Sequence, residues 1–306
     1  MFFHIEHTTE YSYPEPASES FSEMRLRPRD SRHQKVSRFT THIAPFVPVD
    51  SYTDYFENYV EVVSVPFRHT HLVVASSCDV ETLPYSDPLS GLILTVAEAR
   101  HLQRPNQRVL HDFMGSSRYI QFTPETKALS RRFFPPEAAF GPAVKSLNEH
   151  IFRTFKYKPG ATDAGTTVAQ FLTRGEGVCQ DFAHFMISVL RDAGIPARYV
   201  SGYIETEPVD NGTVPAPSDK EEALVGATAS HAWVEVYAPN GHWVGIDPTN
   251  NMIQSERHIV IGSGRDYGDV PPMKGVFKGS PTQHLKVTVT VVREEDSSLG
   301  DADRSG

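Results

Sequence analysis

A cysteine, a histidine and an aspartate in the second half of the chain have the types and settings that nucleophilic catalysis requires. Cys179 lies at the first residue of a predicted helix over 179–193, directly after a glycine-rich turn. Free backbone N–H groups and the positive end of the helix dipole favour the thiolate there, and can also stabilise an oxyanion. An isolated cysteine in such a place is more often a small buried hydrophobe. Its assignment as a nucleophile therefore depends on a base and an orienting group.

A predicted strand hairpin supplies both partners. One strand is predicted over 231–238 and the returning strand over 242–247, joined by the turn sequence Pro239-Asn240-Gly241. His231 stands at the beginning of the first strand and Asp247 at the end of the second. Each residue alone would be interpreted as structural. Together they form a hairpin that can place a base beside a carboxylate.

The register of this hairpin decides whether the two side chains meet. A two-residue loop would put His231 and Asp247 on opposite faces, because side chains alternate along a strand. A three-residue loop, with Gly241 in the left-handed bulge position, places Trp233 opposite Asp247. His231 is then diagonal to Asp247 on the same face, within reach of a long side chain. We predict this loop or another of odd length.

The surrounding pattern predicts an α+β protein with two domains. The first part of the chain has β-branched and aromatic runs punctuated by prolines, which is typical of short strands. From about residue 123 helical spacing dominates, and the helix over 179–193 has a continuous apolar stripe that ends before Gly194. We expect an N-terminal β domain over 1–115, a catalytic core over 116–292 and a disordered tail over 293–306.

Two further segments flank the candidate site. Residues 205–228 are rich in proline, glycine and acidic residues and are predicted to form a long surface loop. Residues 284–292 alternate apolar and polar side chains and are predicted to form a last strand.

Composition limits the classes of function. The 306 residues carry a formal net charge of −9, which disfavours a general nucleic-acid or anionic-membrane binder. Two cysteines are too few for a disulfide framework or a four-cysteine metal site. The N-terminus lacks a basic segment followed by an apolar one, and no stretch approaches the ~20 apolar residues that span a bilayer. We expect a cytoplasmic protein without a membrane partner, and its oligomeric state stays open.

Four segments, in this order, resemble the bacterial transglutaminase-like family. They are Gly177-Val178-Cys179-Gln180-Asp181-Phe182-Ala183-His184, Gly194-Ile195-Pro196-Ala197-Arg198-Tyr199-Val200-Ser201-Gly202-Tyr203, Ser230-His231-Ala232-Trp233-Val234-Glu235-Val236 and Asp247-Pro248-Thr249. The similarity extends over about 155–295 and includes the run from Gly264 to Pro272. The N-terminal β region resembles the domain that precedes this core in bacterial members.

The resemblance implies a papain-like core whose nucleophile-bearing helix packs on an antiparallel sheet. It makes Cys179 the nucleophile, His231 the general base and acid, and Asp247 the orienting carboxylate. It implies attack on an amide carbonyl and a thioester that water or an amine resolves. Family membership leaves hydrolysis and transamidation open.

Departures from better-known relatives refine this hypothesis. Both tryptophans follow Cys179, whereas animal transglutaminases place one near the oxyanion, and no EF-hand-like calcium loop occurs. These departures favour a peptidase or amidase without a cofactor or metal, with Tyr157 as a candidate oxyanion donor from its position. Trp233 and Tyr203 are candidate substrate-binding residues, and Cys78 is predicted to be a buried core residue.

The leading hypothesis is therefore a thiol protease or amidase that acts on a protein or peptide substrate. The alternatives are a protein–glutamine amine transferase that uses the same triad, and a binding or scaffold module without turnover.

Overall fold

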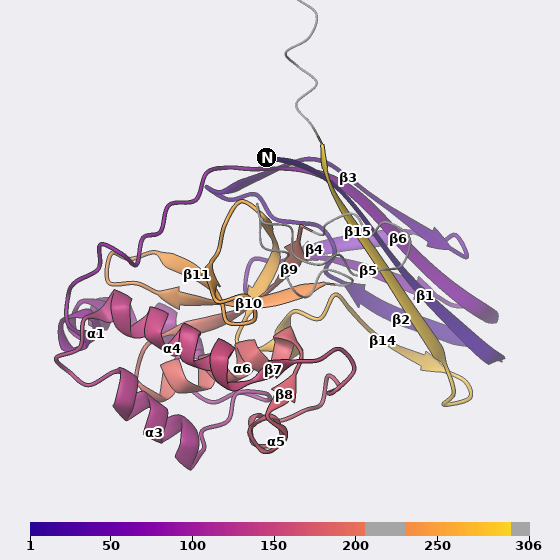
Figure 1. The fold of residues 1–306 in the computed structure, drawn as a ribbon. Helices are drawn as coiled ribbons and strands as arrows, with labels where there is room; N and C mark the ends of the chain where they lie inside the picture. Colours follow the sequence, from indigo (N-terminus) through magenta and orange to yellow (C-terminus); the bar gives the residue numbers. More distant parts are fainter. Residues whose placement is uncertain (206–229, 295–306) are drawn as a thin grey trace, which may run out of the picture.

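The computed structural model describes residues 1–205 and 230–294, which form a β-sandwich region and a mixed α/β region side by side (Figure 1). The predicted loop over 205–228, apart from Glu205, lies outside the described residues, as does the predicted tail beyond Glu294.

The sandwich begins with six strands that follow one another in sequence. They are β1 (Phe2–Ala17), β2 (Glu19–Met24), β3 (Gln34–Ala44), β4 (Val49–Thr53), β5 (Tyr59–Val65) and β6 (His69–Thr82). Together with β14 (Met273–Lys278) and β15 (His284–Glu294) they form two antiparallel sheets, ordered β15-β1-β6-β3 and β14-β2-β5-β4. Buried side chains from both sheets, among them Met24, Val63 and Leu72, pack into one core between them.

The α/β region places its helices against one face of a five-stranded antiparallel sheet. The strands, in the order β12-β11-β10-β9-β13, are β12 (Met252–Ile253), β11 (Trp243–Asp247), β10 (His231–Tyr237), β9 (Ala197–Ile204) and β13 (His258–Gly264). The helices are α1 (Val96–Gln103), α2 (Gln107–Leu110), α3 (Pro124–Phe133), α4 (Phe140–Thr154), α5 (Val168–Arg174) and α6 (Cys179–Asp192). Short 3₁₀ turns η1 (Arg104–Asn106), η2 (His111–Phe113) and η3 (Tyr267–Asp269) and the small pair β7 (Lys156–Tyr157) and β8 (Glu176–Gly177) complete the region.

Helix α6 is the central element of this region. It packs on β9 and β10, and nearly all of its side chains are buried rather than a single stripe. Its C-terminus closes as the sequence predicts: Gly194 has φ +69°, and the N–H of Ile195 donates to the carbonyl of Leu190. None of the helices in the described ranges is both long and apolar enough to cross a membrane.

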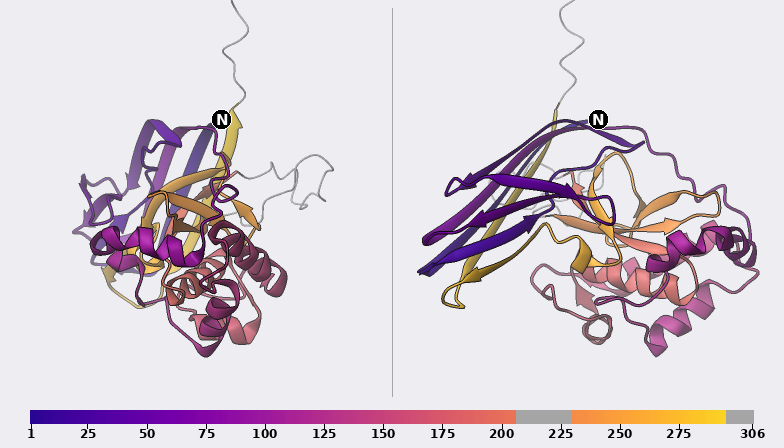
Figure 2. Two further views of the ribbon diagram at one scale, coloured as in Figure 1. Left: turned by 90° about the vertical axis from the view of Figure 1, so that its left-hand side faces the viewer. Right: turned by 180° about the vertical axis from the view of Figure 1, so that it is seen from behind.

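The domain boundaries differ from the predicted 1–115 and 116–292. Helix α1, which follows the β-sandwich strands, contributes Val96 and Ala99 to the core around α6. Conversely β14 and β15 leave the α/β region and complete the two sandwich sheets (Figure 2). The alternating pattern of 284–292 does specify a strand, but a strand pattern does not specify its partner. Arg293 and Glu294, expected in the tail, extend β15.

A separate hydrophobic cluster joins the two regions. Phe3 and Ile5 of β1 and Val291 of β15 pack against side chains of β9 and β13, including Tyr203 and Ile259. Because alternate side chains of a strand share one face, the inner face of β1 and β15 is the surface that meets the five-stranded sheet of the α/β region.

The hairpin register is confirmed. Val234 pairs with Ile246 and Tyr237 with Trp243, and the N–H of Ala238 donates to the carbonyl of His242. The three residues 239–241 therefore form the loop, with Gly241 at φ +84°. This register is the one that brings His231 and Asp247 to the same face.

Truncating Ile5 should destabilise the whole protein. Its side chain is 1% exposed within the cluster between the two regions, so Ile5→Ala should lower the free energy of unfolding by about 2–5 kcal/mol, as measured by urea denaturation. Val292→Ala is the matched control, because Val292 is 50% exposed on β15 and outside the cluster. Equal and small decreases in the free energy of unfolding for both variants would contradict the inferred interface.

Candidate active site

Cys179 begins α6 and is held there by the residues around the helix N-terminus. The side chain of Asp181 accepts the backbone N–H of Val178 at 2.8 Å and the hydroxyl of Thr162 at 2.6 Å. Asp181 thereby caps the helix, and its negative charge lies at the positive end of the helix dipole. The first backbone N–H groups of a helix have no intrahelical acceptor, so they remain available beside the half-buried thiol.

His231 and Asp247 form a buried hydrogen-bonded pair. Nε2 of His231 donates to Oδ2 of Asp247 at 2.8 Å, and both side chains are fully shielded from solvent. This bond leaves Nδ1 as the ring nitrogen that can exchange a proton with substrate or thiol. Nδ1 makes no standard hydrogen bond within the described residues, yet the Cys179 thiol is near enough to influence the ring's protonation.

Asp247 is surrounded by donors. Its Oδ1 accepts the backbone N–H groups of Thr249 at 2.8 Å and Asn250 at 3.3 Å. Its Oδ2 accepts the side-chain amide of Asn250 at 2.7 Å and Nε2 of His258 at 3.3 Å, in addition to His231. A buried carboxylate with this many donors is held ionised and in one orientation.

The electrostatics of the pair favour a charged imidazole. Burial opposes ionisation of both groups, but mutual attraction and hydrogen bonding outweigh it. The pKa of Asp247 is held far below its usual range by His231 and His258, and the pKa of His231 is raised above its usual range chiefly by Asp247. The pair therefore favours an imidazolium on His231 that is held by the carboxylate of Asp247.

His258 is a second buried histidine on the same carboxylate. The backbone N–H of Ser255 donates to its Nδ1 at 3.2 Å, so Nε2 carries the proton that it donates to Asp247. His231, Asp247 and His258 present ligand-type atoms within 4.8 Å of one another, the kind of grouping that can hold a metal ion. Because one oxygen of Asp247 is already the acceptor for both rings, hydrogen bonding accounts for this grouping.

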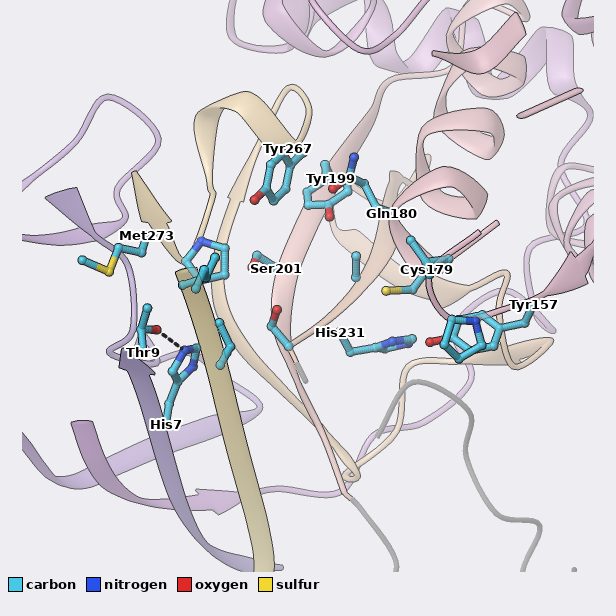
Figure 3. Close-up of a pocket in the computed structure, with 18 of the residues that line it drawn as sticks. His7, Thr9, Tyr157, Cys179, Gln180, Tyr199, Ser201, His231, Tyr267 and Met273 are labelled. Atoms are coloured by element: carbon cyan, nitrogen blue, oxygen red, sulfur yellow. Dashed lines mark hydrogen bonds between the residues drawn. The ribbon is translucent and has the colours of Figure 1, made fainter. Parts of the chain in front are cut away.

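Cys179 and His231 open onto a cavity of about 390 Å³ that lies between the α/β region and the sandwich. Figure 3 shows the sulfur of Cys179 directed into the cavity, with the strands of the sandwich on the opposite side. The α/β region contributes Tyr157, Gln180, Tyr199, Ser201 and Tyr267 to the lining, and the sandwich contributes His7, Thr9, Tyr11, Met273, Leu285 and Val287.

The weaker predictions of substrate-binding residues have different outcomes. Tyr157 lines the cavity, and burial together with the negative charge of Cys179 and Asp247 raises its pKa to about 12, so its hydroxyl keeps its proton at neutral pH. Its role as an oxyanion donor stays a prediction. The prediction for Trp233 is wrong: it is fully buried, and its indole N–H donates to Gln254 at 3.1 Å.

The prediction for Tyr203 is also wrong. Tyr203 follows Tyr199 and Ser201 on the same face of β9, but the sandwich covers it, and its hydroxyl hydrogen-bonds to Nδ1 of His7 at 2.9 Å. Tyr203 therefore belongs to the contact between the two regions. The cavity begins beyond it.

Trp233 occupies its buried position because the neighbouring strand carries glycine. A Cβ on Gly202, which pairs with His231 across the sheet, would lie 2.4 Å from the indole and 2.2 Å from the carbonyl oxygen of Ile259. Any side chain at 202 would therefore displace Trp233, whose ring stacks at 6.0 Å from the ring of His231. Trp233 therefore packs against the ring of His231 and helps to hold it in place.

His184 has a structural role: its Nε2 accepts the backbone N–H of Tyr267 at 3.2 Å while its ring stacks on Tyr119. Cys78 is buried as expected, at 2% exposure. Sequence reasoning missed Asn250 and His258. Asn250 stands close to Asp247 in sequence, and that proximity could have indicated it.

The chain is similar to known families and proteins over most of its length. Residues 127–248 match the Transglutaminase-like superfamily and residues 3–81 match the Bacterial transglutaminase-like N-terminal region. An uncharacterized protein of Mycobacterium tuberculosis is 32% identical over 306 residues, covering 97% of this chain and 94% of its own length. A protein-glutamine gamma-glutamyltransferase of Pseudomonas aeruginosa is 32% identical over 154 residues, covering 48% of this chain and 21% of its own length.

The fold is also similar to a solved structure. The crystal structure of a Cytophaga hutchinsonii protein, provisionally named a cysteine protease, superposes with a TM-score of 0.68 at 19% identity, covering 94% of this chain and 90% of that one. These matches confirm the predicted fold class: a transglutaminase-like core with a cysteine-bearing helix on an antiparallel sheet, preceded by a β domain.

The two cysteines should differ sharply in reactivity. Burial raises the pKa of the Cys78 thiol to about 12, so it stays protonated and shielded, whereas Cys179 borders the cavity beside His231. At pH 6–7 iodoacetamide should alkylate Cys179 at least about tenfold faster than Cys78, as followed by peptide mass spectrometry. His231→Ala should slow the reaction at Cys179 alone. Equal, slow labelling of both cysteines would instead support the scaffold alternative.

The buried His7 should make stability depend on pH. Burial lowers the pKa of His7 to about 4, below the 6.5 expected for an unfolded chain. The unfolded state then binds a proton that the folded state does not, so His7 destabilises the fold as pH falls from 6.5 towards 4, by about 1.4 kcal/mol per pH unit. His7→Gln should remove that part of the slope in urea titrations between pH 6.5 and 4. Parallel curves for wild type and variant would contradict a neutral His7.

Proposed function

Because this chain belongs to the bacterial transglutaminase-like family, we propose that it is a cysteine-dependent enzyme that cleaves amide bonds as a peptidase or amidase. The observation that carries the proposal is the His231–Asp247 pair, buried at the edge of the cavity onto which Cys179 opens. This combination supplies a nucleophile, a base and an orienting carboxylate within one pocket.

In the first step, Nδ1 of His231 takes the proton of the Cys179 thiol. The sulfur then attacks the amide carbonyl of the substrate and a C–S bond forms. Asp247 stabilises the resulting imidazolium through the bond at Nε2, which also fixes which nitrogen faces the thiol. The imidazolium next donates its Nδ1 proton to the leaving nitrogen, the C–N bond breaks, and a thioester on Cys179 remains.

The oxyanion of the tetrahedral intermediate requires donors near Cys179. The backbone N–H groups at the start of α6 are suitable, since they have no intrahelical acceptor. The hydroxyl of Tyr157 is a second candidate, because it borders the same cavity and keeps its proton at neutral pH.

In the second step, His231 takes a proton from water, and the hydroxide oxygen displaces sulfur from the acyl carbon. The thiolate regains its proton through His231, and a carboxylic acid is released. If a primary amine replaces water, the same sequence yields a new amide. This transamidation is the second candidate function, and the similarity to a protein-glutamine gamma-glutamyltransferase supports it.

A scaffold role without turnover is the remaining alternative. The complete triad, with five hydrogen bonds directed at Asp247, argues against it. A cytoplasmic location and a protein or peptide substrate, without nucleic acid, stay predictions that accompany this proposal.

Product analysis on a peptide mixture tests the proposal. The full chain should be incubated with neutral glutamine-containing peptides, with and without dansylcadaverine, and the products identified by mass. A peptidase gives shorter peptides, a glutamine amidase gives a gain of about 1 Da per site, and a transamidase gives the dansyl adduct. We expect hydrolysis products that vanish in Cys179→Ala and persist in Cys78→Ala. Products independent of Cys179, or no product, would contradict the proposal.

A further inference from the structure

The sandwich extends over the catalytic cysteine beyond its contact with the α/β region. The inner face of β1 and β15 packs Phe3, Ile5 and Val291 against the catalytic sheet. Further along the same face, Thr9 and Val287 line the cavity. Because inward-facing residues recur every second position, one continuous sheet face has two parts. One part contacts the α/β region, and the other forms one side of the cavity, which we call the wall.

The side chains of this wall are held in place at its inner end. Nδ1 of His7 hydrogen-bonds to the hydroxyl of Tyr203 at 2.9 Å. Nε2 of the same ring hydrogen-bonds to Thr9 Oγ1 at 3.1 Å (Figure 3). The wall is thereby tied to β9 of the catalytic sheet. At its outer end Val287 is 40% exposed and Leu285 is 56% exposed, so these two side chains remain open to a ligand in the cavity.

The cavity is uncharged across the part of the chain that the structure describes. Apart from the catalytic Cys179 and His231, its described lining consists of hydroxyl, amide, thioether and hydrocarbon side chains and His7, without Asp, Glu, Lys or Arg. A charged substrate group brought here would lose water without gaining a counter-ion, which is costly. A neutral amide would meet the hydroxyls of Thr9, Tyr11 and Ser201.

We propose that the inner face of β1 and β15, represented by Thr9, Tyr11, Leu285 and Val287, is the specificity wall of the enzyme, and that it selects acyl donors whose side chain beside the reacting carbonyl is uncharged. This inference rests on the proposed function, because it assigns the substrate class of the same site. It gives the N-terminal domain a direct part in substrate recognition.

Matched ester probes test the selectivity. The N-benzyloxycarbonyl p-nitrophenyl esters of glutamine, glutamate and lysine differ in charge, and the first two are nearly isosteric. Wild-type protein should be acylated with a kcat/KM at least about tenfold higher for the glutamine ester than for either charged one. A preference for the glutamate or the lysine ester would overturn the inference.

Charge insertion at Val287 tests the wall itself. Val287→Lys should shift the glutamate-to-lysine ratio of kcat/KM about tenfold towards glutamate, and Val287→Glu should shift it similarly towards lysine. Val287→Gln controls for size and polarity. Thr288→Lys controls for net charge. Thr288 is exposed, and because it directly follows Val287 in β15 its side chain points to the sheet face opposite the cavity. Equal shifts from Val287→Lys and Thr288→Lys would overturn the inference.

A thiol-reagent assay separates this inference from the proposed function. The rates at which anionic 2-sulfonatoethyl and cationic 2-(trimethylammonium)ethyl methanethiosulfonate modify Cys179 depend on the cavity but not on acyl transfer. The anionic-to-cationic ratio should rise in Val287→Lys and fall in Val287→Glu, and Thr288→Lys should leave it within about twofold of wild type. Shifted ratios without acylation by any ester would remove the proposed function and leave the wall. Acylation by the esters together with unshifted modification ratios would overturn the specificity wall and leave the proposed function standing.

Discussion

The buried negative charge of Asp247 is the constraint on which the site depends. Burying an unpaired carboxylate is costly in free energy, so the chain surrounds Asp247 with hydrogen-bond donors from the turn that follows it and from neighbouring strands. Thr249 and Asn250 fix the carboxylate from its own turn, and His258 does so from the far edge strand of the sheet. The remaining donor is His231, whose ring is thereby oriented and favoured in its charged form.

The packing of the α/β region follows from this requirement. Helix α6 must present Cys179 to the ring, and its buried Arg191 fixes it by donating to three backbone carbonyls, those of Gly115, Ala197 and Arg265. These carbonyls belong to segments far apart in sequence, so one side chain ties α6 to β9, the strand that follows it, and to the loops around it. Position of the thiol and position of the base are therefore set by the same core.

The hairpin and the contact between His231 and Asp247 were predictable because their determinants are local: Gly241 permits the bulged loop, and the loop fixes the faces of His231 and Asp247. Trp233 and Tyr203 were misassigned because alternation gives the face of a residue but not what covers that face. The partner of β15 was unpredictable for a similar reason. Strand pattern is local, whereas pairing depends on burial that the whole fold creates.

The pairing of β1 with β15 also imposes an order on assembly. Phe2 faces Glu294 and Ser12 faces His284 in the finished sheet, so the strand pairing with the largest sequence separation among the described residues completes the wall beside the thiol. Until residues 284–294 have been synthesised, β1 presents an open edge, and the cavity at Cys179 lacks the side that Leu285 and Val287 line. If the proposed wall selects acyl donors, that selectivity is acquired last, and a nascent chain with a formed Cys179 helix would present a less selective thiol than the finished protein.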